Sequence, residues 1–464
     1  MQLSASILDR LRDIVGPDHL LAETSERAAY ASDETEKLVF LPDAVIRPGS
    51  TTEVSRILAL AHEHRIPVTP RGAGTGLSGG ALPVHGGLVL SIERMDRILV
   101  IDTRDLVAEV EAGVVTGELQ RTVAELGLYY PPDPGSKDSC LLAGNLAENA
   151  AGPHSCKYGT TREWVLGLEG VRADGTVFRT GGRNRKDVAG YDLTRLLVGS
   201  EGTLAVITGA TLRLIGQPTA TLVLLLPFPE LDTAAAAVEA IFREGFAPAA
   251  CELLDAGAIE AVGEVMELPP QLAEQRAVLL IELDGDSSAS LLDRAGELAD
   301  LIERLGGGEV VAAEDVADQR RLWAIRSAVG SAVKHRSIYK EADAVVPRSK
   351  LAELVRAARS AASAHGLRAV CYGHAGDGNL HVNLLRGQLD EDAWIARRDA
   401  CERELFERVT ALGGSITGEH GVGWTQRHFL SLVIDPSMVE LMRSIKQVFD
   451  PRGILNPSKI FPDP

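Results

Sequence analysis

Five glycines crowd into the twelve residues RGAGTGLSGGAL at positions 71–82, directly after a short apolar run. That run, IPVT at 66–69, has the length and composition of a β-strand. Without Cβ atoms, the backbone N–H groups of such a loop can approach an anion closely and cradle a diphosphate. The alternative interpretation of the same residues is a flexible loop that binds nothing.

Two better-known phosphate loops are disfavoured at this position. A Rossmann GxGxxG would need a helix to begin inside the motif and an acidic residue about 20 positions further on. Here the loop runs into Pro83, His85 and a new apolar run instead. A Walker A loop is excluded because the segment has no GK[ST].

The first half of the chain alternates strands with few helices. Residues 41–74 predict a strand, a turn and a helix, with Thr52 as the N-cap and Ile57, Leu58 and Ala61 on the buried face. From 81 to 216 short strands dominate, and the ADG at 173–175 predicts a hairpin.

The second half of the chain has a different pattern, in which longer helices are expected between the strands. Strands are expected at 219–228 and 277–285, and helices at 233–246, 290–307 and 349–367. This pattern predicts an α+β fold in which an antiparallel sheet has helices on one face.

Composition limits the partners and the compartment. The net charge of −18 opposes binding to nucleic acid or to an anionic membrane surface, so an anionic substrate would need a local cation or a metal. Five scattered cysteines without a CxxC exclude an iron–sulfur cluster or zinc ribbon built from this chain alone, and indicate reduced thiols in the cytosol. No apolar run is long enough for a transmembrane segment, and charged residues interrupt any signal-peptide core at the N-terminus.

Two histidine-containing segments form the sharpest chemical signal. In GHAGDGNLHVNLL (373–385) a turn separates His374 at the end of one strand from His381 early in the next. In SITGEHGVGW (415–424) Glu419 and His420 lie between glycines. Two histidines and a glutamate can bind zinc or manganese with coordination positions left open, and His420 is then available as a base. Two unrelated histidines in a hairpin are the alternative, and Asp377 is expected to cap the turn.

Three long segments resemble one family of flavoproteins. The glycine loop resembles the pyrophosphate loop of FAD-binding domains of the PCMH type, also called the vanillyl-alcohol oxidase type. Residues 131–175 and 186–208 resemble blocks of its D-lactate, glycolate and D-2-hydroxyglutarate dehydrogenase branch, which carries an FAD-linked oxidase C-terminal domain. The resemblance implies an N-terminal helical segment (1–36), a two-subdomain FAD-binding domain (37–217), a substrate domain (218–410) and a C-terminal segment with the GEHG loop (411–464).

The resemblance implies a set of FAD contacts. Because RGAGTG contains no histidine, the FAD is expected to be non-covalent. Two positions depart from the family pattern: Ala205 replaces a usual glycine, and His154 a common arginine. The FAD contacts carried over are Arg71, Gly72, Gly74, Thr75, Gly76, Ser78, Gly79, Pro132, Asp133, Ser136, Gly144, Asn145, Asn149, Gly152, Glu201, Ile207 and Asn456.

The family motifs GHxGDGNxH and GEHGxG also imply roles in catalysis. His374, His381 and Glu419 would bind the metal, and His420 would be the catalytic base. Arg326 would hold the substrate carboxylate as a fork, with Asn383 also at the substrate. Lys340 resembles a lysine of the D-2-hydroxyglutarate branch, although it lies one residue further from Asp343.

The predicted reaction is FAD-dependent oxidation of a D-2-hydroxyacid to the 2-oxoacid, with metal assistance and hydride transfer to flavin N5. The alternatives are a metal-independent sugar-acid or lactone oxidase of the same fold, and a non-catalytic flavin-binding subunit of a larger complex. The electron acceptor is expected to be separate: a quinone, an electron-transfer flavoprotein or an iron–sulfur subunit. The sequence leaves open whether the protein forms a homodimer. The expected location is the cytoplasm, either free or held at the inner membrane through a partner.

Overall fold

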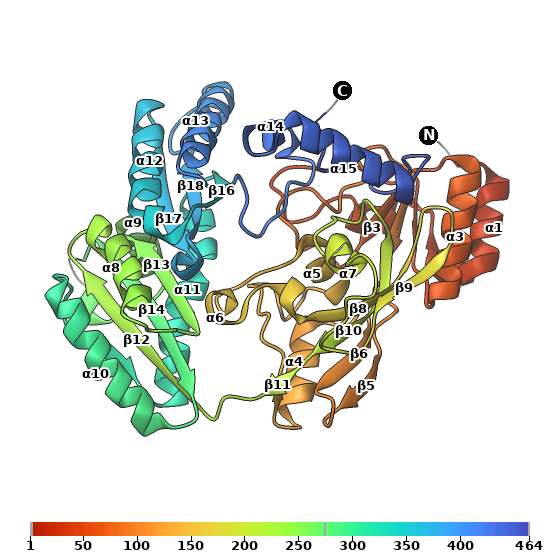
Figure 1. The fold of residues 1–464 in the computed structure, drawn as a ribbon. Helices are drawn as coiled ribbons and strands as arrows, with labels where there is room; N and C mark the ends of the chain where they lie inside the picture. The colour runs from red at the N-terminus through yellow and green to blue at the C-terminus, as the bar shows by residue number, and fades with distance from the viewer. Residues whose placement is uncertain (1–2, 273–274, 463–464) are drawn as a thin grey trace. The chain divides into compact units, whose positions relative to one another are not determined.

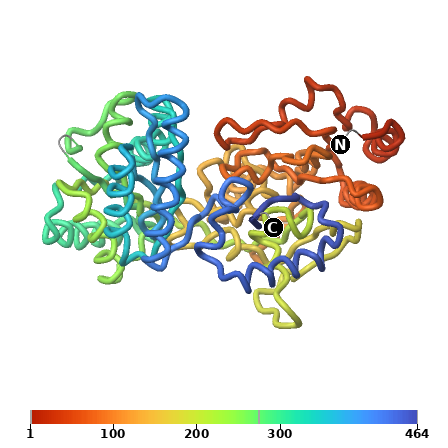
Figure 2. Tube along the Cα trace, turned by 90° about the horizontal axis from the view of Figure 1, so that it is seen from above, coloured from red at the N-terminus to blue at the C-terminus, as the bar shows by residue number. Residues whose placement is uncertain are grey.

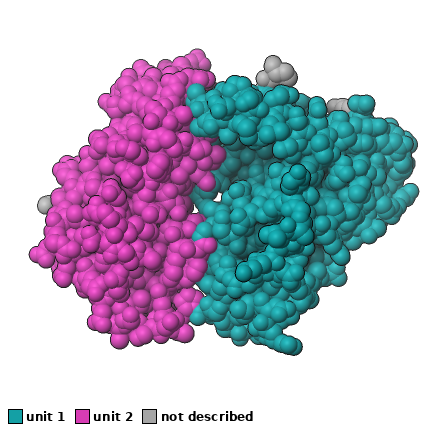
Figure 3. Space-filling view, viewed as in Figure 1, with its two compact units in different colours: residues 1–151, 159–217, 419–464 teal, residues 152–158, 218–418 magenta. Residues whose placement is uncertain are grey.

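A computed structural model describes residues 3–272 and 275–462. The chain divides into two compact units (Figure 3). The first consists of residues 1–151, 159–217 and 419–464, and the second of residues 152–158 and 218–418. None of the helices within the described ranges has the length and apolar character needed to cross a membrane.

A four-stranded sheet opens the first unit, with the strand order β1-β2-β4-β3. Strands β2, β4 and β3 are parallel, and the helix α3 connects β2 to β3. The N-cap of α3 is Ser50, whose Oγ accepts from the N–H of Glu53, so the prediction of Thr52 is wrong by two residues. The elements are α1 (Ala5–Val15), β1 (Leu20–Leu21), α2 (Thr24–Arg27), β2 (Ala44–Ile46), α3 (Thr51–His64), β3 (Val68–Arg71) and β4 (Leu88–Ser91).

A five-stranded antiparallel sheet follows, with the order β5-β6-β10-β8-β9. Strands β8 and β9 form the hairpin predicted at 173–175, where the Asp174 carboxylate accepts from the N–H of Thr176. The elements are β5 (Ile98–Asp102), β6 (Val107–Glu111), α4 (Thr116–Ala124), β7 (Leu128–Tyr129), α5 (Leu142–Glu148), β8 (Val165–Val171), β9 (Val177–Gly181), α7 (Leu193–Leu197), β10 (Val206–Arg213) and β11 (Ile215–Gly216).

The C-terminal segment returns to the first unit (blue in Figure 2). Leu455 forms a parallel bridge with Val68 at the start of β3, and Lys446 donates to the carbonyl of Thr203. The part of this segment around Leu455 therefore lies against the strand that leads into the glycine loop. This segment contains α14 (Leu430–Val433) and α15 (Pro436–Phe449).

The second unit is built on a seven-stranded sheet with the order β15-β12-β14-β13-β17-β18-β16, antiparallel throughout (Figure 1). Its elements are α6 (Ser155–Tyr158), β12 (Ala220–Phe228), α8 (Leu231–Arg243), β13 (Ala250–Asp255), α9 (Ala256–Gly263), β14 (Ala277–Gly285), α10 (Ser288–Arg304), β15 (Val311–Ala313), α11 (Val316–Arg336), β16 (Tyr339–Val345), α12 (Leu351–Ala364), β17 (Arg368–Gly373), β18 (Asn379–Leu385) and α13 (Glu391–Ala411).

Helices cover both faces of this sheet, so the prediction of helices on one face is wrong. On one face α9 and α11 pack on a core that includes Leu254, Leu280 and Val370. On the other, α8, α10, α12 and α13 contact the strands. The physical reason is that the central strands are apolar at successive positions, as in LVLLLPF of β12, and both sets of side chains must be buried.

Candidate active site

The glycine loop leaves β3 at Arg71 with its amides unused. Among the described residues, no N–H group of 72–78 donates a hydrogen bond to the protein. Gly79 ends this run, because its N–H donates to Thr35 Oγ1 at 2.7 Å. Gly74 has a φ of +79°, which strains any side chain there, and a Cβ would lie 2.1 Å from Nη2 of Arg71, so the guanidinium would have to move.

The second predicted loop lies directly against the first. A Cβ on Gly72 would lie 3.4 Å from the amide nitrogen of Gly144, whereas Gly76 and Gly144 both have open space at the Cβ position. Asn145 is buried and its Nδ2 donates to Thr116 Oγ1 at 2.6 Å, which fixes the start of α5. These contacts bring residues more than 60 positions apart to one open surface of the first unit.

Asn149, Asn456 and Glu201, which were also predicted as FAD contacts, form hydrogen bonds within the protein. The Oδ1 of Asn149 accepts from the N–H of Arg162. Asn456 donates to the carbonyls of Gly80 and Glu201, which fixes the C-terminal segment to the end of the glycine loop. The Glu201 carboxylate accepts from the N–H groups of residues 422 and 423, at 2.9 and 2.7 Å. Glu201 therefore anchors the loop that begins with Glu419 and His420.

Glu148 is a residue that the sequence analysis missed. Burial raises its pKa well above the ordinary value, and the neighbouring carboxylates of Glu201 and Asp33 raise it further. Gly421 has a φ of +78°, which strains any side chain there, and a Cβ would lie 2.2 Å from Oε2 of Glu148, so the carboxylate would have to move. No single-sequence signal distinguishes this glutamate from a solvated helix residue.

Of the other predicted FAD contacts, Asp133 and Ile207 are buried, Pro132 accepts at its carbonyl from Gln120, and Ser136 accepts from the N–H of Cys140. The amide of Gly152, in the second unit, donates to Ser155.

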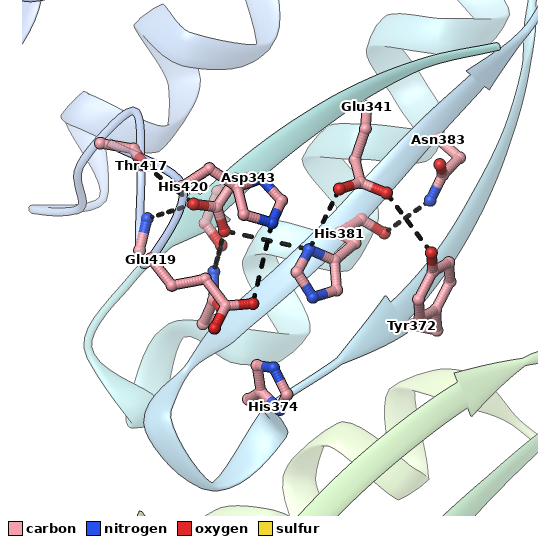
Figure 4. A network of polar contacts seen from close by, with 12 residues as sticks. Glu341, Asp343, Tyr372, His374, His381, Asn383, Thr417, Glu419 and His420 are labelled. Atoms are coloured by element: carbon pink, nitrogen blue, oxygen red, sulfur yellow. Dashed lines mark hydrogen bonds and ion pairs between the residues drawn. The ribbon is translucent and has the colours of Figure 1, made fainter. Parts of the chain in front are cut away.

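The two histidines of the second motif are brought together by a tight turn. His374 follows β17, residues 375–377 form a 3-10 turn, and His381 lies on β18 (Figure 4). Their ring centroids are 5.4 Å apart, and each residue is less than 10% exposed. In the antiparallel register His381 pairs with both Tyr372 and Asp343, so these three side chains share one face of the sheet.

The GEHG loop is tied to the same face through Asp343. One carboxylate oxygen of Asp343 accepts from Thr417 Oγ1 and from the N–H of Gly418, both at 2.8 Å. Glu419 and His420 follow Gly418 directly, so the covalent chain itself places them beside the histidines. One ligand atom from each of His374, His381 and Glu419 lies within 4.8 Å of the other two.

Glu252 on β13 was not identified from the sequence. It is fully buried, and its two oxygens accept from His374 Nδ1 at 2.7 Å and Arg326 Nε at 2.6 Å. Burial alone would raise the pKa of Glu252, but His374 and Arg326 outweigh it and lower the value to about 2. Because Glu252 occupies Nδ1, His374 presents Nε2 to a ligand.

The remaining predicted substrate residues, Asn383 and Lys340, lie on opposite faces of the seven-stranded sheet. Asn383 pairs with Glu341 in the register of β18 and β16, so both lie on the face of His381. Lys340 lies on the opposite face, where Nζ forms an ion pair with Glu402 of α13 at 3.2 Å. The structure therefore does not bring Lys340 together with the other predicted site residues.

Comparison with known proteins identifies the family. The protein-family model described as "FAD linked oxidases, C-terminal domain" matches residues 217–460. The family model described as "FAD binding domain" matches residues 42–181. Glycolate oxidase subunit GlcD of Bacillus subtilis is 39% identical over 99% of this chain and 97% of that protein. A D-lactate dehydrogenase of Archaeoglobus fulgidus is 40% identical over 93% of this chain and 95% of its own length.

The chain belongs to the FAD-linked oxidase family. The crystal structure of p-cresol methylhydroxylase with substrate bound has the same fold, with a TM-score of 0.83 at 19% identity over 99% of this chain and 96% of that one. The predicted family and fold class, PCMH-type FAD binding followed by an antiparallel-sheet domain, are confirmed. The protein is an FAD-linked oxidoreductase.

The first unit of this FAD-linked oxidase fits its cofactor. A diphosphate needs several N–H donors that the protein leaves unused, and 72–78 provide them. Arg71 adds a guanidinium whose Nη1 is buried without a hydrogen-bond partner within the described residues. Burial also lowers the pKa of this arginine, because it disfavours the charged guanidinium. An adjacent anion would favour the charged form again.

The donor set at the histidines suits a divalent metal. Two imidazoles and one carboxylate leave positions open for a substrate, and nitrogen with oxygen ligands is compatible with zinc or manganese. A hydrogen-bonded carboxylate behind a ligating histidine is a recurrent feature of such centres, and Glu252 has that position behind His374.

Proposed function

We propose that this FAD-linked oxidase oxidises a D-2-hydroxyacid to the 2-oxoacid with the help of a divalent metal bound by His374, His381 and Glu419. The observation that carries the proposal is the convergence of these three ligand atoms beside a buried Glu252–Arg326 pair. Relatives named D-lactate dehydrogenase and glycolate oxidase subunit support the substrate class.

When bound, FAD supplies the two-electron acceptor and the metal supplies Lewis acidity toward the substrate hydroxyl. The residues of the chain bind and orient the acid. Arg326 forms an ion pair with Glu252 through its Nε, and the proposed role of its guanidinium is to hold one carboxylate of the substrate. Asn383 lies on the same face, next to Tyr372, and completes the proposed substrate contacts.

His420 is the proposed base that removes the hydroxyl proton. It follows the ligand Glu419 in the chain, and its Nε2 lies 3.8 Å from the Oε1 of Glu419. Glu201 holds the two residues after Gly421 through their N–H groups, so the loop that presents His420 is fixed on both sides. The ring is 15% exposed, which leaves an edge that a substrate can reach.

The other FAD contacts predicted from the sequence are part of this proposal, with Glu201 and Asn456 as residues that shape the loops. We also propose that electrons leave through a separate acceptor, because the five cysteines are scattered along the sequence without a CxxC. The predicted cytoplasmic location and the predicted domain limits stay predictions.

Anaerobic reduction of the bound flavin tests the function. D-lactate and glycolate are each added to the purified holoenzyme, and bleaching of the flavin absorbance is followed before and after treatment with a chelator. We expect bleaching that the chelator abolishes and that added Zn²⁺ or Mn²⁺ restores. Bleaching that survives metal removal would favour the metal-independent oxidase. No bleaching by any acid would favour a non-catalytic flavin subunit.

A further inference from the structure

We infer that a cavity in the first unit binds a phosphate dianion, either free or as a monoester of a small organic molecule. The cavity lies between the start of β8, the end of β9, the loop at 184–192 and the start of α7 (Figure 1). Its volume of about 530 Å³ is within the range of small-molecule sites. None of its lining residues belongs to the predicted FAD contacts or to the proposed metal and substrate residues, so this binding goes beyond the proposed function.

The wall of the cavity is rich in arginine. Its excess of positive charge contrasts with the net charge of −18 of the whole chain. Each of the acidic side chains in the wall accepts a hydrogen bond from a backbone N–H group close to it in the sequence. The lining arginines are Arg162, Arg179, Arg185, Arg195 and Arg213, and the lining acids are Glu163, Asp187 and Asp192.

The arginines differ in whether a carboxylate balances them. Arg179 and Arg195 each form an ion pair with a carboxylate. Arg162, Arg185 and Arg213 form none with any residue that the structure describes. Three cations therefore face one cavity without a counter-charge from the protein.

Two of these unbalanced guanidinium groups are partly removed from water. The Nε atoms of Arg162 and Arg213 are buried and have no hydrogen-bond partner among the described residues. Both groups are held in place, because Arg213 lies over the ring of Trp164 at 4.9 Å and Arg162 Nη2 donates to the carbonyl of Val198 at 3.2 Å. A desolvated cation without a counter-charge is unfavourable, and an anion in the cavity would relieve that cost.

Arg185 adds a second charge close to Arg213. Burial lowers the pKa of Arg213, and the positive charge of Arg185 lowers it further. A guanidinium stays protonated at neutral pH, so the two cations repel each other unless an anion lies near both.

Phosphate suits this wall better than a carboxylate does. The five arginines exceed the three acids by two charges, which one phosphate dianion balances and one carboxylate leaves half balanced. Planar guanidinium groups also bind two phosphate oxygens in parallel. Tyr191 lines the cavity and is 96% exposed, so its ring offers a surface on which the organic part of a phosphate ester can pack.

Titration calorimetry of the FAD-loaded protein tests the site with inorganic phosphate, phenyl phosphate and acetate at equal ionic strength. We expect saturable binding of both phosphates and none of acetate. Tighter binding of phenyl phosphate would identify the ligand as a phosphorylated organic molecule. Equal or weaker binding of phenyl phosphate would identify it as free phosphate.

Two variants each remove one of the unbalanced cations. Arg213→Gln and Arg185→Gln should each raise the Kd for phosphate about 10–100-fold, because a charge-assisted hydrogen bond is lost. Arg185 is exposed, so its replacement leaves the packing of the unit unchanged. Arg183→Gln is the matched control: Arg183 is exposed in the same loop, forms ion pairs with Asp102 and Glu109, and does not line the cavity. Its Kd should equal that of the wild type, and all three variants should retain FAD.

Four results would overturn the inference. They are no binding of either phosphate, binding of acetate as tight as that of phosphate, a Kd that neither Arg213→Gln nor Arg185→Gln changes, and an equal loss of affinity in Arg183→Gln. The last of these would assign the binding to general surface charge. The proposed oxidation is tested separately by flavin bleaching, so either proposal can fail without the other.

Discussion

Replacing Glu252 by glutamine tests how the metal ligands are held in place. The wild-type carboxylate accepts from both His374 and Arg326, at 2.7 and 2.6 Å, and is itself fully buried. A glutamine of the same size has one acceptor oxygen, so its NH₂ group must face one of these two donors. One charge-assisted hydrogen bond is lost, and Arg326 loses its ion pair with Glu252.

The magnitudes follow from these contacts. Breaking a buried ion pair by removing one partner costs about 3–5 kcal/mol, and we expect the lower end because Arg326 is 13% exposed. Loss of the carboxylate behind a ligating histidine weakens metal binding by about 10–100-fold. Glu252→Gln should therefore lower both the free energy of unfolding of the metal-free protein and the affinity for Zn²⁺.

The assay is urea unfolding of the metal-free protein, together with Zn²⁺ affinity from competition with a chromogenic chelator. Glu282→Gln is the matched control, because Glu282 on the neighbouring strand β14 also accepts two hydrogen bonds, from His154 and Trp323, but contacts no proposed ligand. It should lose stability and keep its Zn²⁺ affinity. Equal Zn²⁺ affinities in wild type and Glu252→Gln would refute the reasoning.

Three further predictions concern the base, the substrate cation and a buried lysine. His420→Asn should keep its metal and lose about 10²–10⁴-fold in turnover, with partial recovery at high pH; loss of metal, measured by elemental analysis, would contradict the role of base. Arg326→Lys should raise KM for the 2-hydroxyacid about 10–100-fold while the pH–rate profile keeps its shape, because a point charge replaces a fork. Lys459 is buried against the Leu82 carbonyl, and burial lowers its pKa from 10.5 to about 8. Between these values the unfolded chain binds the extra proton, so the stability of wild type relative to Lys459→Met should rise by about 3 kcal/mol from pH 8 to 10.5; a flat difference in urea unfolding would contradict it.

The sequence by itself determined the local features. The glycine loop at 71–82 could be predicted from the sequence, because its glycines lie within a few residues of one another and leave the backbone accessible. The turn between His374 and His381 is also local, as predicted, and in the structure the two ring centroids lie 5.4 Å apart. The family followed from long contiguous motifs, which need no knowledge of tertiary contacts.

Only the tertiary structure decided which side chains share a face. Successive residues of a strand point to opposite sides of the sheet. Whether Lys340 or Glu341 shares a face with His381 therefore depends on the pairing of β16 with β18, some 40 residues away in the chain. Glu252 lies 122 residues from His374, and only the order of strands in the sheet makes them neighbours. A sequence shows which residues can take part in chemistry. Which carboxylate lies beside a given histidine is decided only when distant strands pair.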